Sequence, residues 1–275
     1  MAHFDMSFYS PSLRKNAKLT VFLPTVSADD YLNDAPVRYY DADTRYQTLY
    51  LLHGSYGDCM DWSLFTGLER YAQDHCLAVV MPSAENSSYV DMERGEDYLT
   101  YITRELPEFL CAMFPLSRRR EDTFIAGLSM GGYGTYRCAL ERPDQYAAAA
   151  SLSGGLEKID HSTSNEAHSV KMPKRYRRGV FGETGAALAG SDNDLRALLK
   201  KRVAEGAELP RLFHTIGEDD FLREGGEAFV AYAETLGVHI DYTLHPGVHN
   251  WDFWDAYIKE VLDWLPLANG MVLPG

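Results

Sequence analysis

The segment Gly127-Leu128-Ser129-Met130-Gly131 places a hydroxyl between two glycines with the spacing G-x-S-x-G. The apolar run 123–126 precedes it and a helical pattern follows it, which is the strand–turn–helix context of a nucleophile elbow. Glycines on both sides of the serine remove side chains that would clash when the backbone turns this sharply. Ser129 is therefore the candidate nucleophile for acyl transfer.

A serine hydroxyl is a weak nucleophile near neutral pH and needs a general base. His249 is the candidate, because it lies in a glycine-containing loop just before the last predicted helix. His245 is the rival in the same loop. Pro246 and Gly247 separate the two histidines, which argues against a helical pair of metal ligands.

The base in turn needs a carboxylate that fixes its tautomer and stabilises the imidazolium. Asp219 and Asp220 compete for this role, because both follow the predicted strand 211–216. We favour Asp220, since the acid often stands three residues after the glycine of a G-x-x-D loop, here Gly217.

An oxyanion hole requires two backbone N–H groups. We expect one from Met130, directly after the nucleophile. We expect the other from the loop after the apolar run 48–52, with Ser55 favoured and Tyr56 as the alternative. His53 then shapes this turn and is not itself a base.

Aromatic residues crowd these loops, and some of them could line a substrate pocket. The candidates are Tyr56, Trp62 and Trp251. Packing in the core is the alternative for each of them, because aromatic side chains bury readily.

Short apolar runs predict buried strands, and amphipathic stretches between them predict helices. The predicted strands are 18–23, 48–52, 77–81, 123–126, 146–152, 211–216 and 238–244. The predicted helices are 61–74, 97–114 with a kink at Pro107, one that follows the elbow and ends near 141, 194–204, one ending near 236, and 251–265. This alternation indicates an α/β fold with a mostly parallel sheet covered by helices on both faces. Because ligands of such sheets lie beyond the carboxyl ends of the strands, the polar groups after these strands should meet there.

The chain has 275 residues and shows no repeat or linker, so we expect a single domain over 1–275. The strand and helix pattern breaks down between about 153 and 192, where we expect an insertion or flap near the site.

The net charge of −14 disfavours nucleic acid and anionic membranes as partners. No run is long enough to span a membrane, and residues 1–10 lack the apolar region of a signal peptide, so we expect a cytoplasmic protein. The four cysteines show no zinc spacing, and free thiols are expected. The mechanism needs no metal and no cofactor, and the expected partner is a small-molecule ester.

Six motifs carry a resemblance to the esterase D-like branch of the α/β-hydrolases, closest to the bacterial tributyrin esterases. They are LLHGSYGDCMDW (51–62), VVMP (79–82), TFIAGLSMGGYG (123–134), SLSGGL (151–156), GEDDFL (217–222) and GVHNWDFWD (247–255). The order serine, aspartate, histidine along the chain is that of the α/β-hydrolase fold. The resemblance extends over about 48–265, and the segment 157–210 matches only loosely.

This resemblance implies a serine carboxylesterase for short acyl chains. Related activities are S-formylglutathione hydrolase, feruloyl esterase and carbohydrate acetyl esterase. Members of the branch often form homodimers or homotetramers, so the resemblance implies such an assembly here. Acyl transfer to an acceptor other than water, and a catalytically silent hydrolase fold used for binding, stay open as alternatives.

Overall fold

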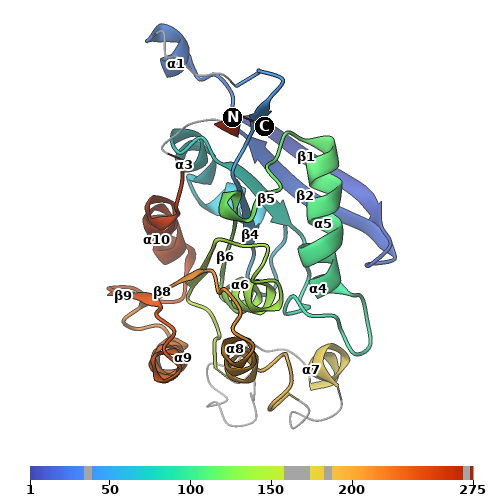
Figure 1. Ribbon diagram of the computed structural model, residues 1–275, viewed down its shortest axis with the longest axis vertical. Helices are drawn as coiled ribbons and strands as arrows, with labels where there is room; N and C mark the ends of the chain where they lie inside the picture. The colour runs from blue at the N-terminus through green and yellow to red at the C-terminus, as the bar shows by residue number, and fades with distance from the viewer. Residues whose placement is uncertain (34–38, 158–173, 183–187, 269–272, 275) are drawn as a thin grey trace.

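The computed structural model describes residues 1–33, 39–157, 174–182, 188–268 and 273–274 (Figure 1). An eight-stranded sheet forms its centre, with the order β1-β2-β5-β4-β6-β7-β8-β9. Its strands are β1 (Ala2–Ser10), β2 (Lys15–Leu23), β4 (Thr48–Leu52), β5 (Ala78–Pro82), β6 (Thr123–Leu128), β7 (Ala148–Leu152), β8 (Arg211–Gly217) and β9 (Asp241–His245). β1 and β2 run antiparallel to their neighbours, whereas the strands from β5 to β9 are all parallel. A separate pair joins β3 (Thr44–Arg45) to β10 (Leu273–Pro274).

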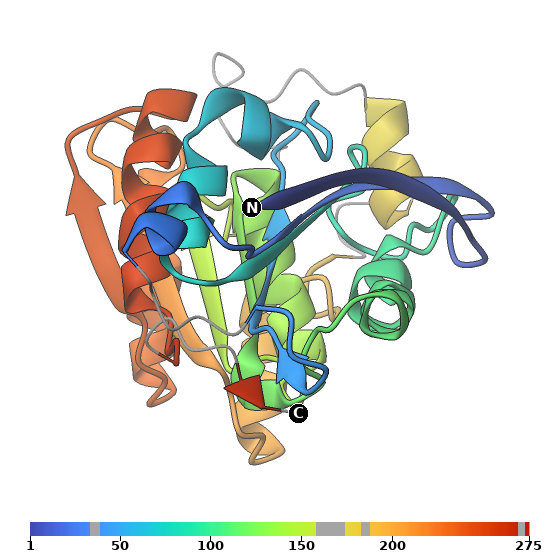
Figure 2. The same cartoon turned by 90° about the horizontal axis from the view of Figure 1, so that it is seen from above.

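Most of the helices connect the parallel strands and cover the sheet, whereas the helix over 28–32 has no buried residue and projects away from the sheet (Figure 1). The helices are α1 (Ala28–Leu32), α2 (Asp61–Phe65), α3 (Leu68–Asp74), α4 (Tyr98–Thr100), α5 (Leu106–Met113), α6 (Met130–Glu141), α7 (Lys174–Phe181), α8 (Leu195–Ala204), α9 (Arg223–Thr235) and α10 (Trp251–Trp264). A π-helical turn η1 (Tyr101–Glu105) joins α4 to α5, and a 3₁₀ turn η2 (Arg120–Asp122) precedes β6. Viewed from above, α10 and α5 lie on opposite sides of the sheet (Figure 2).

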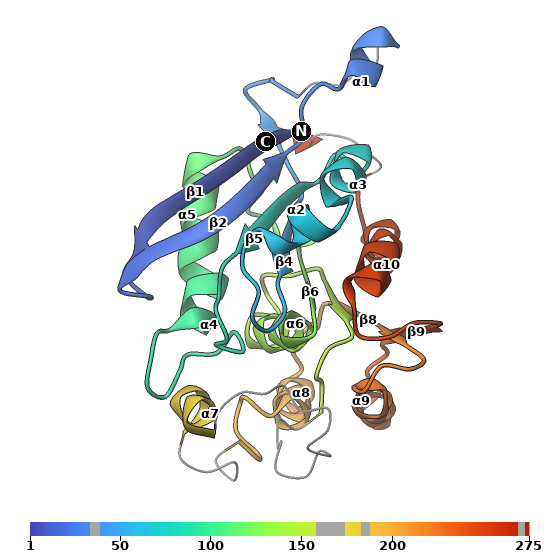
Figure 3. The same cartoon turned by 180° about the vertical axis from the view of Figure 1, so that it is seen from behind.

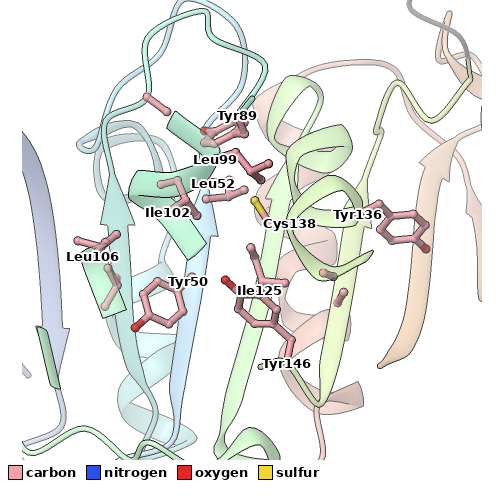
Figure 4. Close-up of a cluster of buried hydrophobic side chains, with 14 of the residues drawn as sticks. Tyr50, Leu52, Tyr89, Leu99, Ile102, Leu106, Ile125, Tyr136, Cys138 and Tyr146 are labelled. Atoms are coloured by element: carbon pink, nitrogen blue, oxygen red, sulfur yellow. The ribbon is translucent and has the colours of Figure 1, made fainter. Parts of the chain in front are cut away.

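The central strands are buried on both faces, and each face has its own core. In β4, Tyr50 and Leu52 belong to the core under α5, α6, α8 and α9, while Leu49 and Leu51 belong to the core under α3 and α10. Successive residues of a strand point to opposite faces, so an unbroken apolar run such as TLYLL is what a doubly covered strand requires. Figure 4 shows the first of these cores, where Tyr50 and Ile125 lie between the sheet and its helices. The predicted α/β architecture is confirmed.

Three local predictions need correction. Residues 2–10 form β1, an edge strand that pairs with β2 along its full length, although no strand was predicted there (Figure 3). The helix predicted over 61–74 is two helices, because Thr66 is extended and Gly67 begins a new turn. The helix predicted over 97–114 contains the π-helical turn η1 just before Pro107, whose ring nitrogen has no hydrogen to donate to the preceding turn.

The flap expected within 153–192 falls partly outside the described residues, since 158–173 and 183–187 are not described. Its described part contains α7, whose carboxyl end is held against the loop after β5. The amides of Glu93 and Arg94 donate to the carbonyls of Val180 and Gly179 at 3.0 and 2.8 Å. Within the described residues no helix has both the length and the apolar character needed to cross a membrane.

Candidate active site

A single residue, Ser129, joins the end of β6 to the start of α6. Its backbone has φ 53° and ψ −114°, a combination that non-glycine residues rarely adopt and that costs on the order of 1–3 kcal/mol. The Ser129 amide donates to the carbonyl of Leu152 at 2.9 Å, which ties the turn to the end of β7. The turn therefore holds the hydroxyl clear of both the strand and the helix.

The glycines around Ser129 are required by close backbone approach. A Cβ at Gly127 would lie 2.5 Å from the carbonyl oxygen of Gly131. A Cβ at Gly131 would lie 2.6 Å from the carbonyl oxygens of both Leu52 and His53. Real Cβ atoms do not approach backbone oxygens this closely, so any side chain at either position would displace the turn or the neighbouring β4 loop.

The structure brings Ser129, His249 and Asp220 into one hydrogen-bonded chain. The Nε2 atom of His249 lies 2.9 Å from the Oγ of Ser129, and its Nδ1 lies 2.8 Å from the Oδ2 of Asp220. An ionised carboxylate can only accept, so Nδ1 carries the proton and Nε2 can accept the proton of the serine hydroxyl. This is the arrangement that a serine nucleophile and its base require.

Asp220 and Asp219 lie in different environments. The side chain of Asp220 is fully buried, and its Oδ1 accepts from the amide of Leu222 at 2.9 Å. Asp219 is exposed to solvent, and its amide donates to the carbonyl of Gly247. Of the two candidate acids, the structure places Asp220 against His249.

The rival histidine, His245, faces another partner. Its Nε2 lies 2.9 Å from the Oε2 of Glu260, and its ring stacks on Tyr257 with 4.0 Å between centroids. The ring of His249, by contrast, lies between Phe221, 4.6 Å away, and the edge-on ring of Trp254, 5.0 Å away. These contacts hold the His249 imidazole in place beside Ser129.

Two backbone amides near Ser129 have hydrogens that can meet an oxyanion. Among the described residues, the amides of Met130 and Ser55 donate to no other group. Met130 is the first residue of α6, where amides have no partner within the helix. A Cβ at Gly54 would lie 3.5 Å from the Cβ of Ser129, so the loop that carries Ser55 lies beside the nucleophile. The amide of Tyr56 donates to Asn86, so it is already engaged.

His53 holds this loop from within. Its Nε2 accepts from the amide of Ala84 at 2.9 Å, so the ring proton is on Nδ1, which donates to the carbonyl of Gly54 at 2.7 Å. Burial lowers the pKa of the His53 imidazole, so the ring stays neutral. Because the C=O and N–H of a trans peptide point in opposite directions, the Ser55 N–H points away from His53.

The three aromatic candidates for a substrate pocket differ in how far their side chains are exposed to solvent. Trp62 is only 1% exposed, and its Nε1 donates to the carbonyl of Leu52 at 3.1 Å. It is therefore a core residue, which corrects its assignment to the pocket. Trp251 is half-buried and meets Trp62 edge to face, while Tyr56 is 64% exposed. Pocket roles for Trp251 and Tyr56 stay predictions.

Where the structure describes the chain, no three His, Cys, Asp or Glu side chains gather into a potential metal site. The four cysteines are free thiols, of which Cys59 and Cys138 are buried and Cys76 and Cys111 are half-buried.

No role in the site was predicted from the sequence for the residues Ser83, Ala84 and Asn86 of the segment 83–89. The structure shows hydrogen bonds between this segment and the loop 53–59. The amides of Tyr56 and Cys59 donate to the side chains of Asn86 and Ser83. The amide of Ala84 and the hydroxyl of Tyr89 donate to His53. The signal was hidden because the responsible turns have positive φ at Glu85, Ser88 and Tyr89, and none of these is a glycine.

Comparison with known proteins gives consistent results. The family model Esterase, described as "Putative esterase", matches residues 10–265. An acetyl esterase of Caldicellulosiruptor saccharolyticus is 35% identical over 269 residues, which cover 96% of this chain and 98% of that protein. A fluorophosphonate-binding serine hydrolase F of Staphylococcus aureus superposes with a TM-score of 0.84 at 32% identity, covering 96% of this chain and 98% of that one. An S-formylglutathione hydrolase of the same organism superposes with a TM-score of 0.81 at 33% identity, with the same coverage of both chains.

Proposed function

This chain belongs to the Esterase family and is a carboxylic ester hydrolase of the α/β-hydrolase fold, and from that premise we propose that it cleaves short-chain acyl esters through an acyl-enzyme on Ser129. The observation that carries the proposal is the unbroken hydrogen-bonded chain from Ser129 through His249 to Asp220. These side chains come from three loops at the carboxyl end of the sheet, and only the folded chain brings them together.

In the first step, the Ser129 Oγ attacks the ester carbonyl while Nε2 of His249 takes its proton. Asp220 holds the proton on Nδ1 and stabilises the imidazolium that forms. The amides of Ser55 and Met130 donate to the oxygen of the tetrahedral intermediate. His249 then passes the proton to the leaving alcohol.

In the second step, water attacks the acyl group on Ser129 and gives its proton to His249. The carboxylic acid leaves, and the proton returns to the serine oxygen. Every proton moves between Ser129, His249, the alcohol and water, so this chemistry needs no additional co-reactant.

The acyl group is proposed to be short because the curated relative at 35% identity is an acetyl esterase. A second candidate is hydrolysis of S-formylglutathione, supported by the S-formylglutathione hydrolase at 33% identity and a TM-score of 0.81. Both reactions transfer a one- or two-carbon acyl group to Ser129 and then to water. They differ in the leaving group, which is an alcohol in one case and a thiol in the other.

A hydrolysis screen separates these candidates. We expect the highest kcat/KM for acetyl and butyryl esters, lower values for octanoyl and feruloyl esters, and loss of all activity in Ser129→Ala. A kcat/KM for S-formylglutathione far above that for every ester would establish the second candidate instead. Absence of turnover with all substrates, together with absence of covalent labelling by a fluorophosphonate, would leave only a binding role.

Product analysis in the presence of added alcohols tests transfer to an acceptor other than water.

The homodimer or homotetramer and the cytoplasmic location implied above are part of the proposal. Sedimentation of the purified chain measures the first, and fractionation of the producing cell measures the second.

A further inference from the structure

We propose that Asn86 is a positioning residue for the oxyanion hole, which it serves by fixing the conformation of Tyr56 and thereby the amide of Ser55. The inference rests on the proposed function, because it assigns Ser55 as an oxyanion donor. Asn86 stands in the loop after β5, 30 residues from Tyr56 along the chain.

The hydrogen bond between these residues is short and has one possible direction. The amide of Tyr56 donates to Oδ1 of Asn86 at 2.7 Å. Tyr56 has φ 69°, in the left-handed region that a non-glycine residue adopts at a cost. The Tyr56 side chain is exposed and cannot hold this conformation by packing. The Gly57 amide closes the turn on the carbonyl of Gly54 at 3.3 Å, and the shorter bond to Asn86 holds the Tyr56 amide itself.

The consequence for Ser55 follows from the peptides on its two sides. On one side, His53 holds the carbonyl of the Gly54–Ser55 peptide. On the other side, Asn86 holds the N–H of the Ser55–Tyr56 peptide. With both peptide planes fixed, the Ser55 N–H keeps one direction, and it needs no reorganisation when charge develops on the substrate oxygen.

Asn86 can act as a support because its own loop is anchored. Oγ of Ser83 accepts from the amide of Cys59 at 3.1 Å, and the amide of Ala84 donates to His53. The buried Tyr89 donates its hydroxyl to the carbonyl of His53 at 2.9 Å. A Cβ at Gly134 would lie 2.3 Å from the Tyr89 ring, so α6 itself leaves room for this anchor.

Loss of this support should reduce kcat more than it changes KM. The Ser55 N–H interacts most strongly with the oxygen when that oxygen is negatively charged, which is in the transition state. Removal of a whole oxyanion donor costs about 10²–10³ in rate, and a donor that is present but loosened should cost less. We therefore expect Asn86→Ala to lower kcat about 10-fold, with KM changed by less than about 2-fold.

The test compares Asn86→Ala with Glu85→Gln on p-nitrophenyl acetate. Glu85 is the neighbouring exposed residue, and its carboxylate pairs with Lys15 rather than with the loop 53–59. Asn86→Asp keeps an acceptor oxygen at the same side-chain length, so its kcat should be at least about 3-fold higher than that of Asn86→Ala. An Asn86→Asp enzyme no faster than Asn86→Ala would overturn the proposal, as would a Glu85→Gln enzyme that loses as much.

A thionoester substrate supplies a readout that a general loss of stability would not move. Sulfur accepts hydrogen bonds poorly, so the ratio of kcat/KM for an ester to that for its thionoester reports the oxyanion hole. We expect this ratio to fall in Asn86→Ala and to stay at the wild-type value in Glu85→Gln; an unchanged ratio in Asn86→Ala overturns the proposal. If Asn86→Ala does not fold, the ratio in Asn86→Asp decides, and it must lie at or near the wild-type value. If the wild-type enzyme cleaves no ester, the proposed function itself fails. If the wild-type enzyme is active and Asn86→Ala has the same kcat, only the role of Asn86 fails.

Discussion

The imidazole of His249 lies 2.9 Å from the hydroxyl of Ser129, although 120 positions separate the two residues in the chain. Ser129 is held by the turn between β6 and α6, and His249 precedes α10, which covers the opposite face of the sheet from α6. The contact between the proposed nucleophile and its proposed base therefore depends on the packing of both faces of the sheet.

Ser129→Ala should abolish ester hydrolysis, with kcat/KM for p-nitrophenyl acetate reduced at least about 10⁴-fold. The variant removes one oxygen that no fold contact needs, so its free energy of unfolding should stay close to that of wild type. Ser7→Ala, on the exposed face of the edge strand β1, is the matched control and should retain full activity. Fluorophosphonate labelling that persists in Ser129→Ala would place the nucleophile elsewhere.

The two neighbouring aspartates provide a second matched pair. Asp220→Asn should lower kcat about 10⁴-fold, because an amide donor beside Nδ1 favours the wrong histidine tautomer. Asp219→Asn should change kcat less than about 3-fold, since its side chain is exposed and the carboxylate of Asp220 already faces His249. Initial rates at pH 7 measure both, and the opposite ranking would move the acid to Asp219.

The choice of Asp220 over Asp219 could be predicted from the sequence because it depends on a local turn. Gly217 ends β8, and its carbonyl accepts from the amide of Asp220 at 3.1 Å, a turn that directs this carboxylate inward. The nucleophile elbow is local in the same sense, since glycine spacing and flanking pattern are both visible within a few residues. The parallel sheet followed from unbroken apolar runs such as β4.

Other features depend on contacts between distant segments, which no local pattern reveals. Trp62 stood among candidate pocket residues in the sequence, but its indole nitrogen reaches the carbonyl of Leu52 and the ring is enclosed by the core. Asn86 is 30 positions from Tyr56 along the chain, and only the fold shows that its side-chain oxygen accepts from the Tyr56 amide. β1 was missed although Phe4, Met6 and Phe8 alternate with polar residues, because its pairing with β2 needs a turn with positive φ at Arg14.

Gly131→Ala should destabilise the nucleophile turn. The added methyl group would lie 2.6 Å from the backbone carbonyl oxygens of Leu52, the last residue of β4, and of His53, which follows it. We expect the free energy of unfolding to fall by about 1–3 kcal/mol and the activity of the remaining folded enzyme to fall as well, since the same displacement reaches Ser129. Urea unfolding and initial rates measure the two effects.

Gly155→Ala is the control for this change, because a Cβ there would meet no atom within 4 Å. Its stability and activity should match those of wild type. Equal behaviour of the two alanine variants would show that the turn tolerates a side chain at Gly131, and it would contradict the close approach described above.

The free energy of unfolding should decrease as the pH is lowered, because of a histidine that takes no part in the proposed reaction. His214 lies fully buried in β8, and burial lowers the pKa of its imidazole to about 4, although Asp220 acts in the opposite direction. In the unfolded chain a histidine titrates near 6.5, so between these two values the unfolded state binds the extra proton and the folded state does not. The stability that depends on neutral His214 is therefore complete above about pH 6.5 and is lost as the pH falls toward 4. From pH 7 to pH 5 we expect the free energy of unfolding to decrease by about 2 kcal/mol from this residue.

His214→Gln isolates that contribution, because glutamine does not titrate in this range and its amide can still donate toward the carbonyl of Ser151, which lies 3.2 Å from Nδ1 of His214. His53 is also buried with a lowered pKa, but it is present in both proteins and cancels in their difference. Urea unfolding at pH 7 and pH 5 should therefore show a smaller loss of stability in His214→Gln than in wild type. Equal losses in the two proteins would mean that His214 takes up its proton in the folded state as readily as in the unfolded chain, which its complete burial argues against.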